Sequence, residues 1–116
     1  MKPSRETEEQ AAGQAACGGH LDIVKYFVEE RKISDEVKSD CVGNATMYGQ
    51  LDCLKYLVEE ARAPLTDWQD IANARYYEQP ECEDYLLEKG SPEPTHEEYA
   101  KLVQDRQPAH EEENGD

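Results

Sequence analysis

The stretch GHLDIVKYFVEE at residues 19–30 recurs as GQLDCLKYLVEE at residues 49–60, an offset of 30. Eight of the twelve positions are identical in these two copies. A third, weaker copy, EQPECEDYLLEK, follows at residues 78–89, an offset of 29. Self-similarity at a fixed period of this size is the signature of a protein built from repeated structural units. We therefore expect a row of such units instead of one round domain.

Each copy has the apolar spacing of an amphipathic helix. In the first copy Leu21, Val24 and Phe27 recur every three residues, which places them on one face of an α-helix. Upstream of each copy lies a segment richer in small residues, at 10–18, 40–48 and 69–77, in which three alanines coincide: Ala15, Ala45 and Ala74. Small residues let helices approach closely, so these segments are predicted to form a second, inner row of helices. Pro80 is predicted to open the third outer helix, where its missing N–H costs nothing.

Residues 15–30 and 45–60 resemble ankyrin repeats, and the run Gly-His-Leu-Asp-Ile-Val-Lys-Tyr at 19–26 is similar to the family's second-helix signature. The resemblance implies an all-α, ankyrin-like helical-repeat solenoid of about three helix pairs plus a terminal helix. Two features depart from the family. Residues 39–42 and 69–72 stand where the family has Thr-Pro-Leu-His, and the period of 28–30 is shorter than the usual ~33 residues. We therefore expect shortened loops between the repeats.

Three regions are predicted along the chain. Residues 1–7 are expected to be a flexible N-terminus, and residues 106–116 carry no periodicity and are expected to be an acidic disordered tail. The region between them, 8–105, is predicted to be the repeat domain. Its expected repeats lie at about 8–33, 34–63 and 64–91, with a half repeat at 92–105.

The charge of the chain restricts its partners. The 116 residues include 12 Lys and Arg and 27 Asp and Glu, which gives a net charge of −15. Such a chain would be repelled by nucleic acid and by anionic membrane surfaces, so neither is an expected partner. No apolar run approaches the ~20 residues that span a bilayer. The first residues lack the apolar core of a secretory signal, so an intracellular location, cytoplasmic or nuclear, is expected.

The residues that could support catalysis or bind a metal are scattered. The cysteines are 24, 12 and 29 residues apart without a Cys-x-x-Cys pair, and the three histidines are isolated. Cys53 and Cys82 align with the apolar Ile23, which predicts buried, reduced, structural thiols. No glycine-rich phosphate loop follows a strand. We therefore expect no enzyme, no catalytic residue, no metal, no cofactor and no small-molecule substrate.

The resemblance to ankyrin repeats implies a non-catalytic protein-binding module that contacts its partner through the concave face of the inner helices. The family uses the end of the inner helix and the loop leading into it, positions occupied here by Ser39, Met47, Tyr48, Trp68, Tyr76 and Tyr77. Exposed Trp, Tyr and Met are common interface anchors. Three acidic residues, Asp67, Asp70 and Glu78, are expected to rim this surface and to favour a basic protein partner. Trp68 has an equally weighted alternative, in which it only covers the seam between repeats.

Two other functions are compatible with the same residues. The chain could be a structural or self-assembling repeat unit without a ligand of its own, although a monomer is expected. It could also be an acidic decoy that occupies a basic protein. Fold alone does not choose among these functions, because repeat scaffolds carry many different binding surfaces.

Overall fold

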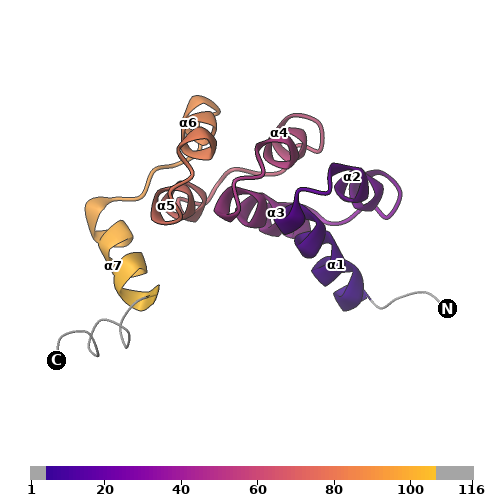
Figure 1. The fold of residues 1–116 in the computed structure, drawn as a ribbon, viewed down its shortest axis with the longest axis horizontal. Coiled ribbons are helices and arrows are strands. Elements are labelled where there is room, and N and C mark those ends of the chain that lie inside the picture. The colour runs from indigo at the N-terminus through magenta and orange to yellow at the C-terminus, as the bar shows by residue number, and fades with distance from the viewer. Residues whose placement is uncertain (1–4, 107–116) are drawn as a thin grey trace.

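The computed structural model describes residues 5–106 and, over that range, contains seven α-helices and no strand (Figure 1). The all-α class predicted from the sequence is therefore confirmed. The helices are α1 (Arg5–Gly18), α2 (Leu21–Glu29), α3 (Asp35–Met47), α4 (Leu51–Glu59), α5 (Gln69–Tyr76), α6 (Pro80–Glu88) and α7 (His96–Arg106). Helix α1 begins inside the segment 1–7, and the segment 106–116 lies outside the described residues except for Arg106.

The first six helices form two rows, and helices of the same row follow one another in space (Figure 1). Helices α1, α3 and α5 make up the inner row, and α2, α4 and α6 make up the outer row, with each outer helix packed on the inner helix that precedes it in the chain. Helix α7 packs beside α5 at the end of the inner row. The resulting body measures 53 × 34 × 19 Å, so it is elongated and thin.

The core is a strip between the two rows. The inner helices contribute small buried side chains, which bring the helices close together: Ala12, Ala16, Ala45 and Ala74. The outer helices contribute larger ones from the predicted apolar faces: Val24, Phe27, Leu54, Leu57 and Leu86. Each fully buried side chain of this larger kind stabilises the fold by roughly 1.5–3 kcal/mol. A narrow strip of apolar residues is thus enough to hold a chain that is only 37% apolar.

The turn inside each helix pair is made three times in the same way. A backbone N–H just before the outer helix donates to the carbonyl of an aligned alanine, at 2.9 Å for Ala15 and 2.8 Å for both Ala45 and Ala74. The preceding residue has a positive φ, 73° at Gly19 and 70° at Gly49. The third turn has Glu78 there at φ 56°, a conformation that costs a non-glycine residue about 1–2 kcal/mol.

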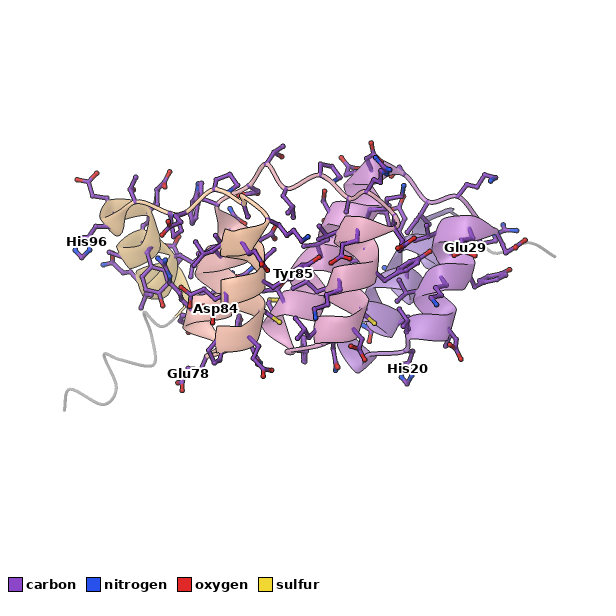
Figure 2. All side chains as sticks on the ribbon, turned by 90° about the horizontal axis from the view of Figure 1, so that it is seen from above. His20, Glu29, Glu78, Asp84, Tyr85 and His96 are labelled. Carbon is purple, nitrogen blue, oxygen red and sulfur yellow. The ribbon has the colours of Figure 1, made fainter. Side chains whose placement is uncertain are left out.

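Neighbouring helix pairs are joined by side-chain hydrogen bonds that recur with the sequence repeat. The Nε2 of Gln50 donates to the carbonyl of Cys17 at 2.9 Å, and that of Gln79 donates to the carbonyl of Met47 at 3.1 Å. On the outer row, two tyrosine hydroxyls donate to glutamates of the preceding helix, Tyr56 to Glu29 at 2.8 Å and Tyr85 to Glu59 at 2.7 Å. Figure 2 shows Tyr85 and Glu29 on this outer row. These contacts fix each pair against the one before it.

The first helix pair differs from the later ones on its outward edge. Ile23 of α2 is 46% exposed, whereas Cys53 and Cys82, at the equivalent places of α4 and α6, are each 1% exposed. Tyr26 is likewise exposed, while its equivalent Tyr85 is buried against the preceding pair. The same positions are therefore covered wherever a helix pair precedes them.

Candidate functional site

A groove of about 1160 Å³ runs along the inner row. Its walls come from α1, α3 and α5, from the loop before α5, and from Arg106 at the end of α7. This is the face that the family resemblance described above implies for partner contacts. The groove crosses successive helices, so a ligand lying in it would contact several helix pairs at once.

The structure separates the six predicted contact residues into two groups. Ser39, Met47 and Tyr48 line the groove, and Tyr48 is 60% exposed at the C-terminal end of α3. Trp68, Tyr76 and Tyr77 do not line it. The expected strip of exposed aromatic residues is thus divided between the groove and a second surface near α7.

The second surface is organised around Arg106 of α7. Tyr76 and Tyr77 pack edge to face with ring centroids 4.9 Å apart. The guanidinium carbon of Arg106 lies 5.3 Å from the centroid of Tyr76 and 5.4 Å from that of Tyr77, which is cation–π distance. Trp68, half-buried, lines a smaller pocket of about 440 Å³ together with residues of α7 such as Leu102. Helix α7 therefore lies against the three aromatic residues that the groove leaves out.

The acidic residues expected at the rim do not share one environment. Asp67 and Glu78 are exposed, whereas Asp70 is only 8% exposed and forms part of the groove wall. Burial, together with the negative charge of Asp67, raises the pKa of Asp70 to about 7. Asp40, on the α3 side of the groove, is exposed, and its pKa is raised less decisively, by partial desolvation from the groove wall and by the nearby Glu36. The groove thus contains a carboxyl group, that of Asp70, whose charge changes near neutral pH.

Asn73 is one of the groove residues that the sequence pattern did not single out. It lies one turn after Asp70 on α5 and is 8% exposed, and its side-chain oxygen Oδ1 has no hydrogen-bond partner in the described structure. The alignment of the repeats does contain a signal that could have identified this part of the groove. Asp70 occupies the place that Cys41, fully buried, occupies one repeat earlier, so a carboxyl group stands at an interior position.

The cysteines have the character of core residues. Cys41, Cys53 and Cys82 are buried and Cys17 is half-buried, and all four are free thiols. Burial raises the pKa of each thiol, that of Cys41 to about 12. A nucleophilic cysteine needs the opposite shift, because the thiolate is the reactive form.

Within the described residues, no three His, Cys, Asp or Glu side chains come together in a way that could hold a metal ion. No helix between residues 5 and 106 combines the length and apolar character needed to cross a membrane. Comparisons with protein-family models, curated proteins and solved structures find nothing that matches this chain.

Proposed function

We propose that the chain is an ankyrin-like helical-repeat solenoid that binds a protein partner in the groove of its inner helices, without catalysis or a cofactor. The observation that carries this proposal is the groove itself. It is a continuous hollow of about 1160 Å³ along α1, α3 and α5. Hollows of this kind, lined by several repeats, are the surfaces on which stacked-repeat proteins take up their ligands.

The recurring hydrogen bonds support the solenoid assignment. Gln50 and Gln79 lie 29 residues apart and reach back to carbonyls of the preceding inner helix in the same manner. Tyr56 and Tyr85, also 29 residues apart, each reach back to a glutamate of the preceding outer helix. The sequence period and the contact period therefore coincide, as expected for units that stack on their neighbours.

Met47 and Tyr48 are the proposed apolar contacts, with Ser39 beside them in the groove. A partly exposed tyrosine offers a large apolar ring and a hydroxyl at small cost in conformational entropy, which suits it to a binding surface. Trp68, Tyr76 and Tyr77 are proposed as a second contact patch, next to Arg106. The net charge of −15 favours a basic partner through electrostatic steering. We further propose that the chain acts as an intracellular monomer.

The self-assembling unit is kept as a second candidate because of one observation. Ile23 and Tyr26 are 46% and 49% exposed on the outward edge of α2, at positions that are covered in the following pairs. Sedimentation of the purified chain across a concentration series tests this alternative. A concentration-dependent rise in mass that is removed by Ile23→Ser would favour self-assembly. A constant monomer mass supports the proposal that the chain binds a separate protein partner.

A random-peptide display selection tests groove binding with ligands of many different sequences. Peptides selected on the wild-type chain are measured against Tyr48→Ala and against Tyr26→Ala, a matched removal of an exposed tyrosine from the outer row. We expect Tyr48→Ala to weaken binding at least about tenfold, since interface tyrosines commonly contribute more than ~1.4 kcal/mol. We expect Tyr26→Ala to leave it unchanged. Equal effects of the two variants, at unchanged helicity, would place the binding surface elsewhere.

The second patch is tested in the same selection with the triple variant Trp68→Ala, Tyr76→Ala and Tyr77→Ala. If the patch contributes, the triple variant loses affinity for the selected peptides. Unchanged recovery with unchanged helicity would limit the contact surface to the groove.

A further inference from the structure

Two polar side chains of α5, those of Asp70 and Asn73, lie largely buried in the groove wall. Asp70 and Asn73 lie one helical turn apart, and each is 8% exposed. Among the described residues, the Oδ1 of Asn73 is buried and accepts no hydrogen bond. The raised pKa of Asp70 has burial and the charge of Asp67 as its causes, and no described hydrogen bond or cation offsets them. Buried polar atoms are hydrogen-bonded in the great majority of cases, and an exception at a groove calls for an explanation.

The equivalent positions in the preceding repeats do not have this arrangement. Asp70 replaces the thiol of Cys41, which is a core side chain. Asn73 aligns with Asn44, whose Nδ2 donates to the carbonyl of Gly13 at 3.4 Å across the inner row. The unpartnered pair is therefore a feature of the third helix pair alone and is not a requirement of the repeat.

The residue of α3 that faces the carboxyl group of Asp70 is a glycine, Gly43. A Cβ atom added to Gly43 would lie 3.8 Å from Oδ1 of Asp70, so the carboxyl group lies next to a residue that has no side chain. Both Gly43 and Asp70 line the groove. A donor group of a ligand can thus approach the carboxyl group from the groove over the surface of Gly43.

The chemistry of the missing ligand follows from the two side chains. The ionised carboxylate of Asp70 only accepts hydrogen bonds, and the free atom of Asn73 is also an acceptor. The ligand must therefore bring several donors and, to offset the buried negative charge, a positive charge. The guanidinium group has five N–H donors in a planar fork that matches the two oxygens of a carboxylate, which a point-like ammonium group does not.

We propose that the carboxyl group of Asp70, with Asn73 beside it, is a receptor for an arginine side chain of the bound protein, reached from the groove over Gly43. This inference rests on the proposed function, since it names the partner chemistry of the same groove. The other charged residues that line the groove in the described structure are Glu9, Asp40, Asp67 and Arg106. Three of these four are acidic, which favours a cationic side chain over an anionic one.

The receptor is sensitive to pH because its carboxyl group has a raised pKa of about 7. At about pH 8 nine in ten Asp70 side chains are ionised, and at about pH 6 only one in ten. Only the ionised form attracts the guanidinium group. The apparent affinity for an arginine ligand should therefore fall about tenfold between these two pH values.

The first test is an NMR titration of the isotope-labelled chain near pH 8 with Nα-acetylarginine methylamide and, in parallel, with its uncharged citrulline analogue. We expect saturable shifts at Asp70 and at the Asn73 side-chain amide, at least about tenfold tighter for the arginine compound. Asp70→Asn should remove this preference. Asp84→Asn, which removes an equal charge from an exposed site on α6 (Figure 2), should retain it. Equal responses to both compounds, or an unchanged preference in Asp70→Asn, would overturn the proposal.

The second test separates this inference from the proposed function. Peptide pools with degenerate flanks and a central Arg, Lys, citrulline or Glu are passed over the immobilised chain. Preferential retention of the Arg pool, lost in Asp70→Asn and kept in Asp84→Asn, supports the receptor. Equal retention of all pools in a Tyr48-dependent manner would overturn the receptor and leave the groove as a binding site. Retention of no pool, with the NMR response intact, would overturn protein binding and assign the site to a free guanidinium compound.

Discussion

Replacing Asp70 by Asn should make the chain more stable at alkaline pH and leave it little changed at acidic pH. Burial in the groove wall and the charge of Asp67 raise the pKa of Asp70 from 3.8 to about 7. Between these two values the folded chain binds a proton that the unfolded chain has released. The free energy of unfolding therefore falls as pH rises through this interval, and the loss is complete above about pH 7.

The size of the effect follows from the shift. About three pKa units at 1.36 kcal/mol each correspond to about 4 kcal/mol, an upper figure because local relaxation lets water reach the carboxyl group. That is a large fraction of the 5–15 kcal/mol that stabilises a typical domain. Asn has nearly the same shape as Asp and does not ionise. Asp70→Asn should thus raise the free energy of unfolding by up to about 4 kcal/mol near pH 8. Near pH 4 it should change the free energy of unfolding by less than about 1 kcal/mol.

Urea unfolding between about pH 4 and pH 8.5 provides the measurement, followed by circular dichroism and by the fluorescence of Trp68, the one tryptophan of the chain. Asp84→Asn is the matched control, since it removes the same charge from an exposed position on α6. Its stability should run parallel to that of the wild type at every pH. The reasoning would be refuted if the Asp70→Asn profile also ran parallel to the wild-type profile across the whole range.

Three further predictions concern glycines and thiols. Gly43→Ala should stabilise the chain by about 0.5–1 kcal/mol, since the added Cβ makes only an ordinary contact at 3.8 Å. Gly13→Ala should not stabilise it, because the added Cβ would lie 2.9 Å from an asparagine amide. Equal changes in the urea midpoints of the two variants would contradict this. Gly49→Ala should cost about 1 kcal/mol more than Gly90→Ala, since both have positive φ but only the former displaces the glutamine that joins two pairs. In native protein, Ellman's reagent should modify Cys17 first, with the other three thiols reacting only on unfolding; simultaneous reaction of all four would contradict their burial.

Apolar spacing is sufficient to predict the outer helices. Leu21, Val24 and Phe27 do lie on one helix, with Val24 and Phe27 in the core, and Pro80 does begin α6. Those features depend on contacts between residues three or four apart, which a periodic sequence specifies directly. The positive φ at Gly49 also follows from sequence, because the chain must turn sharply between the two helices of a pair.

The site is harder to predict because it depends on how the helices stack. The sequence suggests a rim position for Asp70, yet this residue is only 8% exposed because α5 packs against α3, an arrangement that no local sequence pattern specifies. The aromatic residues Tyr48, Tyr76 and Tyr77 lie at the ends of equivalent segments of successive sequence repeats, which predicts that they share one surface. The structure divides them, since α7 folds back and brings Arg106 onto Tyr76 and Tyr77. A contact between an inner helix and the last described helix lies outside what a 30-residue period can encode.

The hydrogen bonds between helix pairs give the row of helices a direction. At the outer row and at the turns, the later pair supplies the donor and the earlier pair supplies the acceptor, as in Tyr56 to Glu29 and Gln50 to the carbonyl of Cys17. The outward edge of the first pair therefore ends in a donor position, Tyr26, while α6 ends in an acceptor position, Glu88. Two like edges brought together would set donor against donor or carboxylate against carboxylate. The molecule thus has two chemically different ends. The donor edge of one copy is complementary to the acceptor edge of another, whereas two donor edges or two acceptor edges are not complementary.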